Sequence, residues 1–192
     1  MPIVDRVAPP AVRTLAMHAL TPRKPKLRVV EDGREPLWRQ RRMARTGLIL
    51  RTGIYEPPVL TPAGRGFALS ADLGVQFFEV CVLAKVYGIA RGMADACGGS
   101  DGEGDGTSTP GRMATIPLKT VQYFFEDWPV HPLRVQHALA RLRGRGLLPR
   151  SRYKRVACDI TRLERIGGRL SEMDRWVDDT GEEMRRVLLH GD

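Results

Sequence analysis

The sequence of 192 residues contains no asparagine and few cysteines. Cys81, Cys97 and Cys158 form no CxxC pair, which excludes a zinc framework of the usual ligand spacing and a disulfide scaffold. Unpaired cysteines of this kind are typical of a reducing compartment. Residues 1–5 lack the charged and then apolar profile of a signal peptide. We therefore expect a cytoplasmic protein.

A long uninterrupted apolar run is also missing. The longest apolar stretch covers residues 73–94, and it contains Gln76, Glu79, Lys85 and Arg91. These polar groups are too numerous for a transmembrane helix. We expect no membrane partner.

The motifs of the common enzyme classes are absent. The histidines are scattered, with no HExxH pair, and neither a GxxxxGK phosphate loop nor a GxSxG nucleophile turn occurs. We therefore predict no catalytic residue, no metal site and no cofactor, and a protein that is not an enzyme.

Positive charge is abundant and unevenly distributed. The net charge is +9, with 26 arginines against 5 lysines, a bias that a GC-rich genome also produces. The distribution is therefore more informative than the total. Residues 1–70 carry +8 and residues 112–170 carry +9, whereas residues 71–111 and 171–192 each carry −4. Such concentration is expected of a protein that contacts nucleic acid.

A pattern of residues occurs twice, about a hundred residues apart, once in each basic block. Basic residues lead into Gly-Leu-aliphatic, then arginine, then tyrosine, and the pattern closes on aliphatic-Thr. Gly47 and Thr61 are 14 residues apart in the first copy, and Gly146 and Thr161 are 15 apart in the second. A repeat of this size predicts two similar small domains.

Apolar spacing and chain-breaking residues predict the elements around this repeat. The expected elements are a helix over 36–47, a hairpin over 49–61, helices over 117–127 and 132–145, and a β-wing over 147–161. A helix starting at the capping-box pattern Ser171–Asp174 should close the chain. The expected domains are 1–70, a buried central helix at 71–97, a flexible Gly-rich linker at 98–111, a second domain at 112–170, and a packing or dimerisation helix at 171–192.

Both blocks resemble the winged helix-turn-helix superfamily, in particular its MarR and PadR types. The resemblance is carried by Val135–Leu148 in the second block, and by Arg45–Ile49 and Leu60–Arg65 in the first. The second block departs from the pattern at Glu164, where the family has glycine. The implied fold is mainly α with small β-wings: two winged helix-turn-helix domains in tandem, a buried central helix and a C-terminal amphipathic helix.

The resemblance implies that double-stranded DNA is the partner, with a recognition helix in the major groove and a wing over the backbone. Arg134, Gln136 and His137 are expected near base edges, because Arg pairs with guanine and Gln with adenine. The residues expected at phosphates in this block are Arg141, Arg143, Arg145, Arg150, Arg152, Lys154 and Arg155. In the first block, the expected helix contacts are Arg39, Arg42 and Arg45, and the expected backbone contacts are Arg51 and Arg65.

We therefore expect a sequence-specific DNA-binding protein of a bacterium or phage, most simply a transcriptional regulator that joins the nucleoid when bound. One alternative is a plasmid or phage replication or partition factor. Another is a winged-helix scaffold that binds an acidic protein and no DNA. A homodimer through residues 71–97 or 171–190 is a further option.

Overall fold

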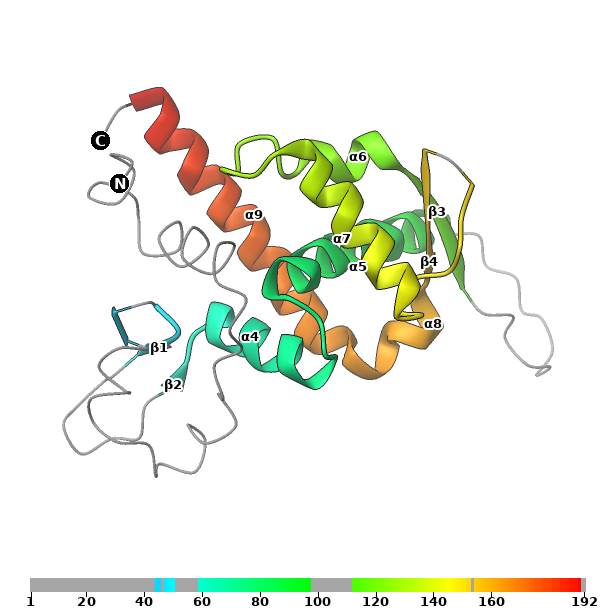
Figure 1. The fold of residues 1–192 in the computed structure, drawn as a ribbon, viewed down its shortest axis with the longest axis horizontal. Helices are drawn as coiled ribbons and strands as arrows, with labels where there is room; N and C mark the ends of the chain where they lie inside the picture. Colours follow the sequence, from blue (N-terminus) through cyan, green and yellow to red (C-terminus); the bar gives the residue numbers. More distant parts are fainter. Residues whose placement is uncertain (1–43, 46, 51–58, 98–111, 153, 191–192) are drawn as a thin grey trace.

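The computed structural model describes residues 44–45, 47–50, 59–97, 112–152 and 154–190 (Figure 1). This part is mostly helical, with two antiparallel sheets of two strands each. The predicted mainly helical fold class is confirmed at that level. Most of the helix predicted over 36–47, the tip of the hairpin and the linker lie outside the described residues.

The first block contains a strand pair and a capped helix. β1 (Ile49–Leu50) pairs with β2 (Val59–Leu60), so the hairpin predicted over 49–61 is confirmed at its paired ends. α4 (Pro62–Asp72) follows, and the Thr61 hydroxyl accepts the Gly64 N–H at 3.0 Å. The same hydroxyl donates to the Gly47 carbonyl at 2.6 Å. Thr61 therefore caps α4 and at the same time connects the start of this helix to Gly47.

The helix predicted to run without a break through residues 71–97 is wrong at its start. α4 ends at Asp72, and α5 begins only at Phe77 and runs to Cys97. Gly74 between them has φ +66°, a conformation that ends helices and favours glycine. No single helix among the described residues is long and apolar enough to span a membrane; α4 and α5 meet that criterion only together, with a 101° bend between them.

The second block is built on a sheet that the sequence analysis missed. Its elements are β3 (Met113–Pro117), α6 (Leu118–Tyr123), α7 (Pro132–Gly144) and β4 (Arg155–Asp159). β4 pairs with β3, and not with a strand inside the predicted wing at 147–161, so that part of the prediction is wrong. The β3 side chains alternate between exposed and buried, which is the period of a half-buried strand. The helix predicted over 132–145 is confirmed as α7.

The chain continues through α8 (Ile160–Leu163) and a 3₁₀ turn (Glu164–Ile166) into α9 (Gly167–His190). The predicted start of the last helix at Ser171 is wrong. The 3₁₀ turn leads directly into Gly167, so Ser171 lies inside the helix, where it has no free helix end to cap. The amphipathic character predicted for this helix is confirmed, because Leu170, Met173, Val177, Thr180 and Met184 are all buried.

α5 is the centre of the core. Its residues from Phe77 to Tyr87 are all buried, so the burial predicted for 71–97 is confirmed over that part of the helix. Residues 71, 72 and 76 before it and 91–93, 95 and 96 after it are exposed, so the prediction is wrong at both ends. α4, α7, α9 and β3 pack around it (Figure 1). Buried residues from Leu48 to Met184 belong to one cluster, so the two blocks share a core within the described residues. A homodimer through 71–97 and one through 171–190 both stay predictions.

Six aromatic rings connect the elements around the amino-terminal end of α5. Phe67 of α4 stacks on Phe77 at 4.1 Å between ring centroids, and Phe77 meets Trp176 of α9 edge-on at 5.7 Å. Trp176 contacts Trp128 at 6.2 Å, and the series returns to α5 through Phe125 and Phe78. Edge-on and offset rings add stabilisation beyond their buried area. These contacts fix α4, the α6–α7 connection and α9 against the same end of α5.

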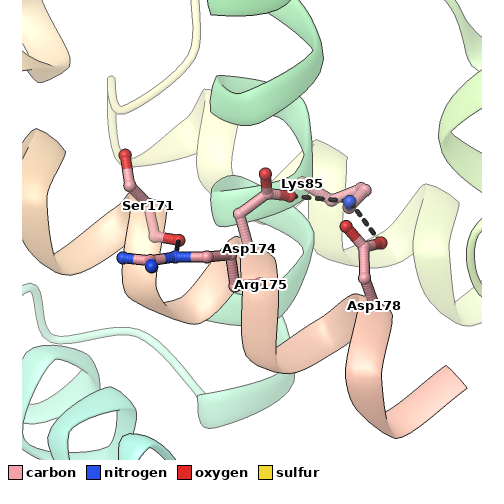
Figure 2. Close-up of polar contacts among 5 residues, drawn as sticks. All are labelled: Lys85, Ser171, Asp174, Arg175 and Asp178. Carbon is pink, nitrogen blue, oxygen red and sulfur yellow. Dashed lines mark hydrogen bonds and ion pairs between the residues drawn. The ribbon is translucent and has the colours of Figure 1, made fainter.

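Lys85, in the middle of α5, is buried and paired with two carboxylates of α9 (Figure 2). Its Nζ lies 2.7 Å from Asp174 Oδ1 and 2.6 Å from Asp178 Oδ1, and 4.3 Å from the centre of the Phe124 ring. Burial raises the pKa of Asp174, and the contact with Lys85 opposes that rise. A buried ammonium is tolerated only with such partners. The cluster therefore fixes α9 along α5.

We predict that Lys85→Ala destabilises the protein by about 3 kcal/mol, because it leaves the Asp174 carboxylate partly buried without its cation. Arg91→Ala on the same helix is the matched control. Arg91 is exposed and its ion pair with Asp95 spans 3.8 Å, so its loss should cost less than about 0.5 kcal/mol. Urea unfolding of both variants measures the difference. Equal costs would show that the buried cluster does not stabilise the fold.

Candidate nucleic-acid interface

The start and the end of α7 are both defined by local interactions. His131 precedes the helix, and its Nδ1 accepts the Leu133 N–H at 3.2 Å, while Pro132 occupies the first helical position. Gly146, with φ +70°, follows the helix end. Gly47 has φ +71° at the corresponding place in the first block. The Gly-Leu step of the repeat therefore has the same backbone geometry in both copies.

α7 has one buried face and one exposed face. Val135, Ala138, Leu139 and Leu142 are buried against the core. At 100° per residue, the line of positions opposite to them runs through Leu133, His137, Ala140 and Gly144, and all four are exposed. A Cβ added to Gly144 would meet no atom within 4 Å. The outermost line of the helix therefore carries no charged side chain. Its side chains become smaller toward the carboxyl end of the helix.

Basic side chains line one flank of this face. Arg134, Arg141 and Arg145 follow each other at helical spacing, and each is exposed at least in part. Gln136 and His137 are exposed on or beside the outermost line. The three residues predicted near base edges thus all lie on the amino-terminal half of α7, with His137 on the outermost line and with Arg134 and Gln136 on opposite sides of it.

Arg141 already has a partner in the protein. Its Nε lies 2.6 Å from Glu79 Oε1, and the Glu79 side chain is only 2% exposed. Glu79 Oε2 accepts the Gln76 N–H at 2.8 Å, the reach-back bond of a capping box at the start of α5. Arg141 therefore neutralises a buried carboxylate and holds α7 on α5. That role is additional to the phosphate contact predicted for it.

The chain between α7 and β4 is held by Arg143. Its Nη2 donates to Ser151 Oγ at 2.8 Å and to the Arg155 carbonyl at 2.9 Å. Leu148 is buried beneath this segment. Lys154 has φ +64°, which is unusual for a residue with a side chain and marks a tight turn before β4. The exposed basic residues presented along it are Arg150, Arg152, Lys154 and Arg155.

Residues 132–158, which include α7 and most of β4, contain eight basic residues and no acidic one. The ends of this stretch border on Asp127 and Asp159. A surface of this composition attracts anions over a distance of about 8–10 Å at physiological salt.

Of the residues predicted in the first block, the structure describes two. Arg39, Arg42 and Arg51 lie outside the described residues. Arg45 is exposed at the helix end before Gly47. Arg65 is paired with Glu172 of α9 at 2.9 Å, and both side chains are about two-fifths exposed. Arg65 therefore connects α4 to α9 in this structure.

Other functional groups are sparse in the described part of the chain. No three His, Cys, Asp or Glu side chains among the described residues are placed to hold a metal ion. Cys81 and Cys158 are buried and free. Burial raises the pKa of both thiols, that of Cys158 to about 12, so neither is a reactive thiolate at neutral pH.

The sequence analysis missed Glu79 and the uncharged outer line of α7. A signal for Glu79 existed, since an acidic residue in an otherwise apolar stretch needs a partner. Helical spacing already places Leu133 opposite the apolar stripe of α7, but no role was predicted for it.

No family model, curated protein or solved structure matches this chain. Its function is therefore inferred from the surface chemistry of α7 and of the segment that follows it.

We predict that Arg141→Ala costs about 3–5 kcal/mol in the free energy of unfolding, because it leaves the buried Glu79 carboxylate without its cation. Arg145→Ala, one helical turn further along the same flank, should stay within about 0.5 kcal/mol of the wild type. Denaturant unfolding of the two variants makes the comparison.

A second substitution separates charge from packing in that experiment. Glu79→Gln in the Arg141→Ala background removes the unpaired charge and should recover most of the loss. A double variant no more stable than Arg141→Ala alone would contradict the assigned ion pair.

Proposed function

We propose that the protein binds double-stranded DNA sequence-specifically and acts as a transcriptional regulator. In this proposal, α7 enters the major groove, and the segment from residue 147 to residue 154 follows the adjacent backbone. The observation that carries it is the exposed face of α7, which is basic on its flank, uncharged at its outermost line and free of acidic residues through residue 158. Because Ala140 and Gly144 have small side chains or none, the backbone of α7 can approach a second surface closely there.

The order of the elements supports a winged helix-turn-helix unit. Helix α5, strand β3, helices α6 and α7 and strand β4 follow one another, with β3 antiparallel to β4. In the winged helix-turn-helix superfamily that this chain resembles, the third helix of such a series is the recognition helix, a position that α7 would occupy. The unit so defined starts with α5, so residues 98–111 would lie within it and not between two domains.

The division of labour proposed for the basic residues follows from their positions. Arg134, Gln136 and His137 lie on the first turns of α7, where a recognition helix reaches base edges. Arg150, Arg152, Lys154 and Arg155 lie beyond the helix, where contacts to phosphates set position and affinity without reading sequence. The first group should therefore control specificity, and the second should control salt dependence.

Selection from a random duplex library, at about 50 mM and about 200 mM salt, tests the proposal directly. We expect one motif to be enriched, and the logarithm of affinity to fall with the logarithm of salt by about 0.9 per phosphate contact. Salt-sensitive binding without enrichment would contradict sequence-specific regulation. Absence of binding at both salt concentrations would overturn DNA binding, and would favour a scaffold whose basic face meets an acidic protein.

Two substitutions should distinguish a residue that contacts bases from one that contacts phosphates on the selected duplex. Arg134→Ala is expected to cost about 1–3 kcal/mol there and little on unrelated duplexes, because a bidentate base contact is lost. Arg152→Ala should weaken all duplexes alike and reduce the salt slope by about 1. Fluorescence anisotropy titrations on matched and scrambled duplexes measure both effects.

The matched control is Arg186→Ala, which also removes one positive charge. Arg186 lies on the exposed face of α9, where it pairs with Glu182. It should leave the affinity for both duplexes nearly unchanged. If Arg186→Ala weakens binding as much as Arg152→Ala does, the effect reflects total charge and not the proposed interface.

A further inference from the structure

Leu133 is an exposed apolar side chain at the start of the exposed face of α7. It is 50% exposed at the second position of α7, on the outermost line of the helix together with His137. Arg134 follows it, and Gln136 lies one turn further along the helix. No buried residue of the core requires a leucine at this position, since the buried face of α7 is complete with Val135, Ala138, Leu139 and Leu142.

The backbone around Leu133 is fixed. Its N–H is bonded to His131 Nδ1 at 3.2 Å, and Pro132 before it restricts the chain to the helical start. The first turn of α7 is therefore set before any ligand binds. A side chain on a preset backbone loses less conformational entropy when a partner covers it.

The major groove of DNA offers such a side chain one kind of apolar partner. The groove edges of the bases present hydrogen-bond donors and acceptors, and only thymine adds a methyl group, at C5. A leucine placed over another base edge would remove water from polar atoms without replacing its hydrogen bonds, which is unfavourable. A leucine in the groove therefore selects for thymine.

We propose that Leu133 is a specificity-determining residue that contacts the C5-methyl group of a thymine in the target duplex. This inference rests on the proposed function, because it requires α7 to lie in the major groove. It extends that function by assigning the recognition of one base to an apolar contact, beside the hydrogen bonds of Arg134 and Gln136.

The test uses the duplex selected from the random library and replaces its thymines by deoxyuridine one at a time, which removes only the methyl group. At one position, deoxyuridine should weaken binding of the wild-type protein about fourfold, the factor that burial of one methyl-sized group corresponds to. For Leu133→Ala, thymine and deoxyuridine at that position should bind equally well. Substitution of an exposed residue should leave the fold intact, which circular dichroism checks.

Met93→Ala is the matched control. Met93 is also an exposed apolar residue, at 42% exposure, but it lies near the carboxyl end of α5 and not on α7. It should retain the full preference for thymine over deoxyuridine. A wild-type protein that binds its selected duplex but discriminates at no thymine overturns the role of Leu133 and leaves the proposed function standing. If Leu133→Ala prefers thymine over deoxyuridine as strongly as the wild type does, the role of Leu133 is likewise overturned and the proposed function still stands. Absence of any DNA binding overturns the proposed function and the inference together.

Discussion

The fold depends on the burial of two opposite charges carried by one helix. α5 is buried from Phe77 to Tyr87, and within that part it brings Glu79 and Lys85 into the core at 1% and 3% exposure. An isolated charge at either position would cost more than the whole protein is normally stable by. Each charge therefore has to meet its counterpart, Glu79 with Arg141 of α7, and Lys85 with Asp174 and Asp178 of α9. Because the two charges differ in sign, α7 and α9 cannot exchange places around α5 without leaving both unpaired.

This pairing has a consequence for the surface. Arg141 lies on the flank of α7 that carries Arg134 and Arg145, so the ion pair with Glu79 fixes how far the helix is rotated about its own axis. With that rotation fixed, the uncharged line from Leu133 to Gly144 points away from the core. The same rotation places the basic flank along one side of that uncharged line. The orientation of the proposed interface thus follows from a contact inside the protein, and not from the ligand.

Local features of the fold were predictable from sequence, and features that depend on distant contacts were not. The bounds of α7 follow from Pro132 and from the glycines after Arg143, and the repeated Gly-Leu step predicted equivalent turns at Gly47 and Gly146. The break at Gly74 was missed because apolar residues continue on both sides of it. Strand β3 was missed because its partner lies some forty residues further along the chain. Lys85 and Asp178 are 93 residues apart, and no spacing rule joins such a pair. For the interface, the basic residues and the exposed position of Leu133 were identifiable from helical spacing, whereas the pairing of Arg141 with Glu79 required the three-dimensional structure.

Arginine excess alone does not explain the surface of α7. Elsewhere in the described structure, several arginines lie beside carboxylates, as in Arg65 with Glu172, Arg169 with Asp72 and Arg185 with Asp127. Residues 132–158 supply no carboxylate of their own, and the one carboxylate that reaches Arg141 comes from the buried end of α5. Basic residues concentrated in this way create a positive surface that attracts anions. In the proposed function, the phosphates of a duplex would be those anions, along α7 and the segment beyond it.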